Sequence, residues 1–424
     1  MSVRQWSNSG RERAPRTTRQ YLARYAQPEV DIAEAVSGAW SAAVVLPLLD
    51  ETMAAVTRIA ERLPSNALLV AVVNATEDRT PDEHESNATL LGALGVAKEK
   101  AFELVHVAGR DVLVIDRARP GRRFRRREGV GLARRIGLDL ALKLRTEGRI
   151  EHPYLHTTDA DASLPVGYPA MAARLSAAPR WSYPFWHETA AGEVGEATAA
   201  YELWLRYYVV GLRRAGSRYG DHCLGSTMAV EADHYAAVRG VPRRRGGEDF
   251  YLANKLRKLG PVATPGTAPI RLQARRSRRV PFGTGPAVAR LVATEELAVV
   301  HPNGFDDLRE AHDALDRFVA CGQPTRPRSS PARRAWDALD APASLARIAA
   351  STTSSAARRT RVDDWFDAKR TLLFMHRVRD AGRGEVPWRE AMAAWGAPME
   401  MMAARKWLAA RDHGPQPSAN GSSR

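Results

Sequence analysis

The chain has 424 residues, and 44% of them are hydrophobic, so it can bury a core and is not a wholly disordered protein. Lys and Arg number 63 against 48 Asp and Glu, and the resulting net charge of +15 favours a polyanionic partner: nucleic acid, an anionic membrane surface or a phosphorylated small molecule. Arginine far outnumbers lysine, and a GC-rich genome would produce the same skew, so the charge alone does not choose among these partners.

The two cysteines, Cys223 and Cys321, form neither a metal-binding spacing nor a disulfide framework, which fits a reducing cytosol. The first residues lack the apolar core of a secretory signal, and there is no run of about 18 apolar residues that would span a bilayer. We therefore expect a soluble cytoplasmic protein with no transmembrane segment.

Residues 1–30 are polar and rich in arginine, and they predict a basic N-terminal arm. Apolar runs then alternate with segments of helical periodicity. The predicted strands, with their terminal turns, are 41–49, 66–82, 110–118 and 153–165, and the predicted helices are 50–63, 86–104 and 132–148. This alternation indicates an α/β domain with a mostly parallel sheet that is covered by helices on both faces.

The pattern changes after residue 290. Helical segments dominate 291–412, interrupted by a linker rich in Pro, Arg and Ser at 323–334, and the polar tail 413–424 is predicted to be disordered. The predicted organisation is thus a basic arm, an α/β domain over 31–290, a helical C-terminal region and a tail.

Three polar clusters follow predicted strands: Asp50-Glu51, Asn74 to Asp78, and Asp159-Ala160-Asp161. The carboxyl ends of parallel strands share one edge of a sheet, and ligands bind there. Asp159 and Asp161 can converge on one ion, and their hard oxygens suit Mg²⁺ or Mn²⁺ bound to substrate phosphates. The other interpretation is that this segment only turns the backbone.

Five segments in this order resemble the family 2 glycosyltransferases, which are inverting enzymes of the GT-A fold. They are VVLPLLDE, VVNATEDRT, GVGLARRIGLDLAL, HTTDADASLP and the segment from GSTMAVEAD to GGEDFYLANKL, and the resemblance covers residues 40–285. It implies a Rossmann-like GT-A domain that transfers a sugar from a nucleotide-diphosphate sugar, of the UDP or GDP type, to an acceptor hydroxyl.

The resemblance also implies roles for individual residues. Pro47, Asp50 and Glu51 would line the nucleotide base, and Asn74, with Asp78 nearby, would recognise it. Asn74 stands where the family often has Asp, which leaves the nucleotide open.

The remaining donor-site roles concern the D-x-D motif. Arg134 would support the nucleotide and this motif. Asp159 would face the nucleotide-sugar, and Asp161 would be the stronger ligand of Mn²⁺ or Mg²⁺.

Glu248 and Asp249 begin a predicted helix after two glycines. Acids at this position are favoured by the helix dipole without any function. The resemblance instead makes Asp249 the catalytic base and Glu248 its support.

Two basic segments are open to two interpretations each. Residues 122–127 form either a solvated loop or a lid over a diphosphate, and Arg276 and Arg279 are candidates to stabilise the departing diphosphate. Between the two acidic motifs, the aromatic residues of 181–186 could stack on an acceptor, and His187, Glu188 and His222 could bond its hydroxyls.

Two other functions are open. A sugar nucleotidyltransferase would need a glycine-rich basic loop after the first strand, where this chain has PLLDETM. A basic nucleic-acid-binding protein fits the charge, but the chain has no zinc, helix-turn-helix or RNA-binding signature, and we expect no nucleic acid.

Overall fold

The computed structural model describes residues 15–170, 178–189, 191–273, 284–294 and 297–413. The chain forms two compact units. The first unit comprises Met1–Ala160, Gly167–Ala177 and Ala229–Arg244, and the second unit comprises Asp161–Val166, Ala178–Met228 and Arg245–Arg424. The domain boundaries predicted from the sequence, at 30, 290 and 412, do not coincide with the boundaries of these two units, and they stay predictions.

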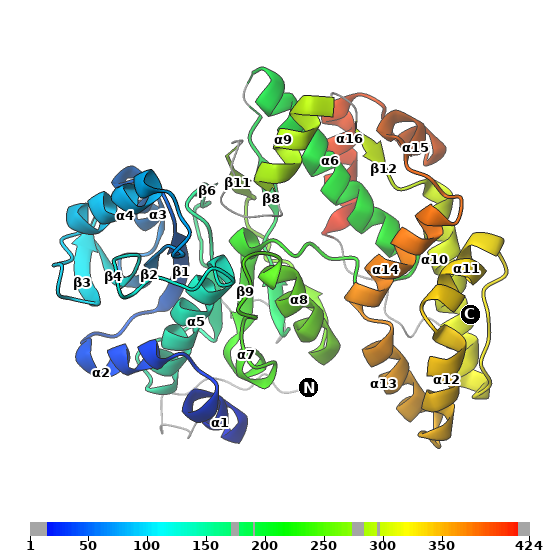
Figure 1. The fold of residues 1–424 in the computed structure, drawn as a ribbon, viewed down its shortest axis with the longest axis horizontal. Helices are drawn as coiled ribbons and strands as arrows, with labels where there is room; N and C mark the ends of the chain where they lie inside the picture. Colours follow the sequence, from blue (N-terminus) through cyan, green and yellow to red (C-terminus); the bar gives the residue numbers. More distant parts are fainter. Residues whose placement is uncertain (1–14, 171–177, 190, 274–283, 295–296, 414–424) are drawn as a thin grey trace. The chain divides into compact units, whose positions relative to one another are not determined.

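A mixed, mostly parallel sheet forms the centre of the first unit (Figure 1). Its strands follow the order β9-β5-β1-β2-β4-β3. They are β1 (Ala42–Leu48), β2 (Ala67–Asn74), β3 (Phe102–Val107), β4 (Arg110–Arg117), β5 (Tyr154–Thr157) and β9 (Met228–Glu231). β1 is parallel to β2 and β5, β2 is parallel to β4, and β3 is antiparallel to β4.

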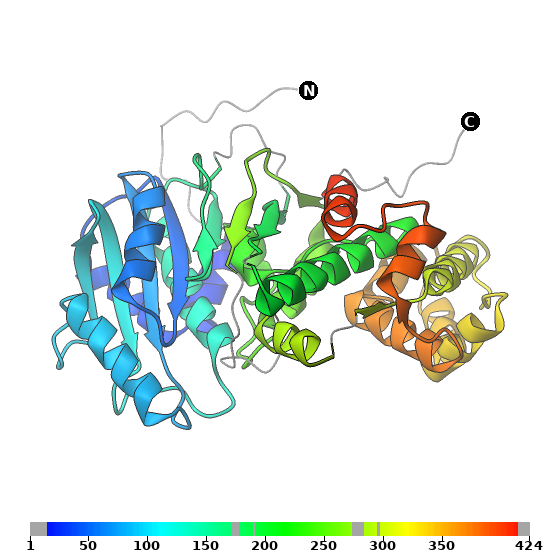
Figure 2. The same cartoon turned by 90° about the horizontal axis from the view of Figure 1, so that it is seen from above.

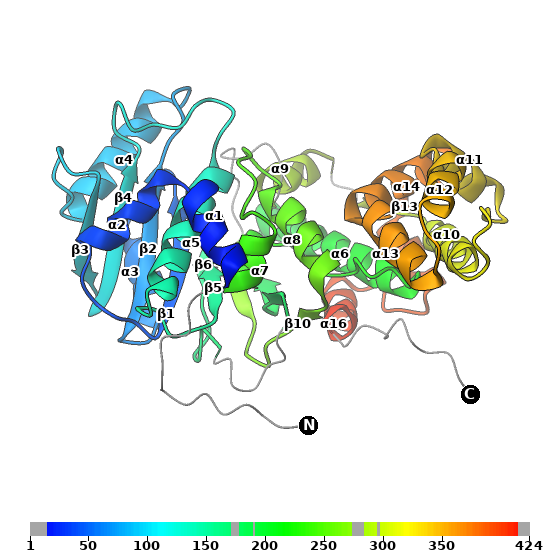
Figure 3. The same ribbon diagram turned by 90° about the horizontal axis from the view of Figure 1, so that it is seen from below.

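Helices flank this sheet, which confirms the predicted α/β class. They are α1 (Arg16–Arg24), α2 (Ile32–Ala35), α3 (Met53–Arg62), α4 (Pro81–Ala93), α5 (Val130–Thr146) and α7 (Ala232–Ala237), with a 3-10 turn at Pro28–Asp31. α3 and α4 lie on the face seen in Figure 2, and α1 and α2 on the face seen in Figure 3.

β1 and β2 are apolar, apart from Asn74 at the end of β2, because both faces of the sheet are covered. Every residue of β1 and β2 is buried. Pro47 is part of β1. The strand tolerates it because β5 pairs with β1 only at Val44 and Val45, so at Pro47 the strand has a partner, β2, on one side.

One local prediction for the first unit, the helix 86–104, was wrong in its bounds, and the strand β3 was missed. The predicted helix 86–104 begins earlier, at Pro81, where Thr80 and Glu83 form a capping box, and ends at Ala93. The strand β3 follows, and a tight turn with positive φ at Ala108 (49°) and Gly109 (73°) joins it to β4.

The predicted basic arm is folded where the structure describes it. Residues 16–24 form α1, and Tyr21 on this helix is 1% exposed and donates a 2.6 Å hydrogen bond to the buried carboxylate of Asp139. Tyr235 donates to the same oxygen of Asp139, also at 2.6 Å. The polar, arginine-rich composition of this segment gave no sign of this buried contact.

The second unit combines small sheets with helices. β6 (Ala162–Ser163), β11 (Ile270–Leu272) and β8 (Phe185–His187) form one sheet, and β7 (Arg180–Ser182) runs parallel to β10 (Val262–Ala263). Its longest helix is α6 (Glu193–Arg214), and α8 (Glu248–Leu259) and α9 (Thr284–Thr294) complete this part.

Residues 302–412 are mainly helical, as the sequence indicates. The helices are α10 (Pro302–Cys321), α11 (Ser330–Ala338), α12 (Ala341–Ala350), α13 (Ser355–Trp365), α14 (Ala368–Asp380), α15 (Trp388–Ala394) and α16 (Met401–Asp412). A short pair, β12 (Ala298–Val299) and β13 (Val386–Pro387), accompanies them. They share one hydrophobic core with α6, which includes Tyr207, Phe305 and Trp336. Of the helices in the described ranges, none has the length and apolar character needed to cross a membrane.

Candidate functional site

The carboxyl ends of β1, β2 and β5 lie at one edge of the sheet of the first unit. The parallel register pairs Leu48 with Val73, and Val45 with Thr157, so the three strands end close together. Asn74 at the end of β2 and the loops that carry Asp50 and Asp159 therefore lie at the same edge, as expected for a ligand-binding edge.

Arg134 holds Asp159 at this edge. Its Nη2 donates to Oδ1 of Asp159 at 2.6 Å, and its Nε donates to the hydroxyl of Thr157 at 3.0 Å. Arg134 is 3% exposed, whereas the side chain of Asp159 is 36% exposed. A buried guanidinium thus fixes a carboxylate that is accessible to solvent.

Arg58, which the sequence analysis did not single out, holds the next residue. It comes from α3, and its Nη2 donates to the backbone oxygen of Ala160 at 2.6 Å. Two arginines from different helices therefore fix consecutive residues of the D-x-D segment. An arginine in an amphipathic helix looks like any solvated residue, so the sequence carried no specific signal for it.

Asn87 links the loops after β1 and β2 and was also missed. Its Oδ1 accepts from the backbone amide of Asp50 at 3.0 Å, and its Nδ2 donates to the backbone oxygen of Asn74 at 3.3 Å. The side chain of Asn74 donates to the backbone oxygens of Leu48 (2.9 Å) and Val72 (3.2 Å). In this structure the amide of Asn74 thus joins the ends of β1 and β2.

Asp50 has a positive φ of 51°, which marks a sharp turn directly after β1, and Glu51 follows it half-buried. Asp78 accepts from the hydroxyl of Thr76 at 2.6 Å and forms an ion pair with Arg126 at 3.4 Å. These acids all follow the carboxyl end of a parallel strand.

The basic segment 122–127 is neither simply solvated nor free to close as a whole. Arg122 pairs with Asp116 at 2.7 Å, Arg123 donates to the backbone oxygen of Ala118 at 3.0 Å, and Phe124 is buried. At least three of the six residues in this segment are therefore held by contacts within the first unit.

The second unit carries the other acidic residues. Glu248, 3% exposed, begins α8 after Gly247, whose φ is 71°. Asp249 is half-buried, and it accepts from the backbone amides of Gly225 (3.1 Å, on Oδ2) and Phe250 (2.8 Å, on Oδ1). The carboxylate of Asp249 is therefore held in one orientation by backbone donors.

Asp161 precedes β6 and belongs to the second unit, whereas Asp159 belongs to the first. The backbone oxygen of Asp161 accepts from the amide of Gln273 at 3.1 Å, next to β11. Arg276 and Arg279 lie outside the described residues.

The chain was compared with protein-family models and with curated proteins. Neither comparison gives a match.

Most of the aromatic residues that could stack on an acceptor belong to the core. Trp181 and Tyr183 are 0% exposed and Phe185 is 2% exposed, so these three side chains do not present a stacking surface. Trp186 is half-buried, with the guanidinium groups of Arg206 (5.4 Å) and Arg405 (4.1 Å) near its ring.

His187 is likewise part of a buried ionic network. It bonds Glu202, and Glu202 forms ion pairs with Arg206 (2.7 Å) and Arg405 (2.9 Å). Burial by itself raises the pKa of Glu202, but the hydrogen bond from His187 and the two arginine charges hold this pKa well below its usual value.

One cluster in the second unit has the residue types of a metal site. Ligand atoms of His222, Asp412 and His413 lie within 4.8 Å of one another. Burial lowers the pKa of His413 to about 4, so its imidazole is neutral. Asp412, however, already accepts from Arg206 at 2.5 Å and from His222 at 2.9 Å, which favours an ionic network over a cation.

Proposed function

We propose that this protein is a metal-dependent glycosyltransferase of the GT-A type that uses a nucleotide-diphosphate sugar. The observation that carries the proposal is the pair formed by Arg134 and Asp159, at 2.6 Å, at the carboxyl end of β5. The neighbouring strand ends supply Asp50 and Asn74 at the same edge, where α/β sheets bind nucleotides.

Asp159 and Asp161 offer hard carboxylate oxygens two residues apart, and Asp159 is accessible to solvent, so this donor set suits Mn²⁺ or Mg²⁺. Such an ion, when bound, neutralises charge on the diphosphate of the donor. Arg134 fixes Asp159, and Arg58 fixes the backbone of Ala160 between the two acids.

Asp249 would act as the base. Its carboxylate takes the proton of the acceptor hydroxyl as the acceptor oxygen bonds to the anomeric carbon. The bond from this carbon to the diphosphate oxygen breaks, and the electron pair leaves with the nucleoside diphosphate. The backbone amides of Gly225 and Phe250 orient the carboxylate of Asp249 for this proton transfer.

Calorimetric titration of the purified protein with UDP and GDP, with and without Mn²⁺, tests the donor site. We expect metal-dependent binding of one nucleotide in the wild type and its loss in Asp159→Asn and Asp161→Ala. Glu151→Gln is the matched control, because Glu151 is an exposed acid just before the opposite end of β5.

The catalytic role of Asp249 needs a separate test. Asp249→Asn should retain nucleotide binding and lose donor turnover, measured as release of nucleoside diphosphate. Unchanged metal-dependent nucleotide binding in both Asp159→Asn and Asp161→Ala would show that the donor site is elsewhere.

A further inference from the structure

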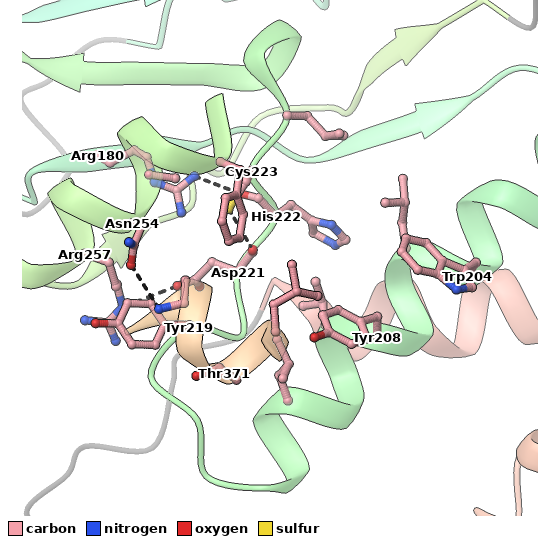
Figure 4. Close-up of a pocket in the computed structure, with 18 residues that line it drawn as sticks. Arg180, Trp204, Tyr208, Tyr219, Asp221, His222, Cys223, Asn254, Arg257 and Thr371 are labelled. Carbon is pink, nitrogen blue, oxygen red and sulfur yellow. Dashed lines mark hydrogen bonds and ion pairs between the residues drawn. The ribbon is translucent and has the colours of Figure 1, made fainter. Parts of the chain in front are cut away.

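A cavity of about 180 Å³ lies within the second unit (Figure 4). Its walls are α6, α8, α14 and the segment from Tyr219 to Leu224, with Arg180 from β7. Most of the lining is apolar, including Trp204 and Tyr208 from α6 and Phe250 from α8. Apolar cavities of about 150 Å³ are large enough for a benzene ring, so this one can hold a six-carbon ring or a short aliphatic chain.

Arg180 is the unusual part of this lining. It is 2% exposed, its Nη1 donates to the backbone oxygen of His222 at 2.7 Å, and its Nε has no hydrogen-bond partner. Among the described residues no carboxylate forms an ion pair with it. A buried cation without a counter-charge costs stability, and an anionic ligand would supply that charge.

The other arginine and the amide of the lining are already engaged, whereas the hydroxyl of Thr371 has no hydrogen-bond partner in the described part of the chain. Arg257 donates to the backbone oxygen of Arg218 at 2.6 Å and lies 3.4 Å from a carboxylate oxygen of Asp221. Asn254 uses its amide on Asp367 and on the backbone amide of Ala368. Burial raises the pKa of Cys223 to about 11, so this thiol is neutral. Among the described residues that line the cavity, Arg180 is therefore the cation that can pair with a ligand.

The same walls adjoin Asp249. Phe250 follows Asp249 directly on α8 and lines the cavity. Leu224 also lines the cavity, and the backbone amide of its neighbour Gly225 donates to Asp249. A molecule in this cavity would lie beside the segment that holds the proposed base.

We propose that this cavity binds the acceptor and that the acceptor is a hydroxylated compound with a small apolar body, aryl or short-chain alkyl, and a carboxylate that pairs with Arg180. This rests on the proposed function, because it assigns the acceptor class of the same reaction. The acceptor hydroxyl loses its proton to Asp249 and forms the new bond to the anomeric carbon, while the diphosphate leaves with its electron pair.

The test is titration of the full chain with 4-hydroxybenzoate and its neutral isostere 4-hydroxybenzamide, and with 6-hydroxyhexanoate and 6-hydroxyhexanamide, followed by calorimetry or ligand-observed NMR. At least one acid should bind about tenfold or more tightly than its amide, because a hydrogen-bonded charge pair is worth this much. Arg180→Gln should remove the preference and Arg180→Lys should restore part of it. Arg359→Gln, at an arginine of α13 whose side chain is 41% exposed and pairs with Asp316, should leave it unchanged.

Two cavity-filling variants test the location. Ala253→Phe and Leu205→Trp, on different helices, should abolish binding of the acid, and metal-dependent nucleotide binding and circular dichroism show that each variant is folded. In these variants transfer to the acid is lost while slow hydrolysis of the donor by water persists.

The inference and the proposed function can fail separately. Binding of the acid that depends on Arg180, without any nucleotide binding, would retain the cavity as a carboxylate site and overturn its role as an acceptor site. Nucleotide binding with no acid bound, or with equal binding of acid and amide, would overturn the cavity's role and leave the donor site intact.

Discussion

Arginine side chains show how far one residue type can differ between sites in this protein. Arg134 is buried beside Asp159, Arg206 is buried between Glu202 and Asp412, and Arg180 is buried without a carboxylate partner among the described residues. In the sequence, all three belong to the same arginine-rich composition. Their partners come from distant parts of the chain, up to 206 residues away for Arg206 and Asp412, so only the fold distinguishes them.

These environments predict opposite effects on the stability of the free protein. Arg206→Met leaves Asp412 and one side of Glu202 without their cation and should cost about 3–5 kcal/mol of unfolding free energy. Arg180→Met removes a buried cation that lacks a carboxylate partner among the described residues, so the free energy of unfolding should stay the same or rise. Urea denaturation of both variants measures this, and a cost at Arg180 as large as that at Arg206 would show that Arg180 is a structural residue.

At the scale of elements, the packing of α5 on β1 depends on one glycine. A Cβ at Gly137 would lie 2.3 Å from a methyl group of Val45, so the helix can approach the strand this closely only without a side chain. α5 also carries Arg134, and its close approach sets the position of that guanidinium at the end of β5.

Gly137→Ala should therefore destabilise the protein by about 1–3 kcal/mol through overpacking, despite the better helix propensity of alanine. Gly92→Ala is the matched control, because this glycine is on α4 and a Cβ there meets nothing within 4 Å. The control should stabilise by about 0.5–1 kcal/mol. If thermal melts show both variants gaining stability, β1 and α5 are not in the close contact described.

At the scale of the whole molecule, several buried histidines make the fold sensitive to acid. Burial lowers the pKa of His312 to about 4, and it lowers the pKa of His156 and His222 as well. A histidine whose pKa is lower in the folded state binds fewer protons there than in the unfolded chain. Its contribution to stability is complete above pH 6.5 and is lost as the pH falls from 6.5 towards 4.

Urea unfolding should accordingly show a free energy that falls steeply between pH 6.5 and 4. His312 alone accounts for about 3 kcal/mol of this fall, from the difference between its ordinary and folded-state pKa. His312→Leu should flatten the pH profile by a similar amount, whereas His106→Gln, at a side chain that is 76% exposed, should not change it. A profile that His312→Leu leaves unchanged would mean that this imidazole titrates normally.

Much of the α/β architecture could be predicted from the sequence, because the central strands are continuous apolar runs and their helices have clear periodicity. The runs at 41–49 and 110–118 became β1 and β4 almost unchanged, and the acids after β1, Asp50 and Glu51, were found from their position alone. The sequence was less informative about β3. This strand has only six residues, most of them are partly exposed, and the strand is held by its pairing with β4.

The sequence by itself determined the buried parallel strands and the acidic residues that follow them, since local apolar pattern and chain position are enough for both. Only the tertiary structure decided that Arg58 and Arg134 fix the D-x-D segment, that Trp181 and Tyr183 belong to the core, and that Arg180 lines an apolar cavity. Those facts depend on contacts between residues far apart in the chain, and no local pattern of residues encodes such contacts.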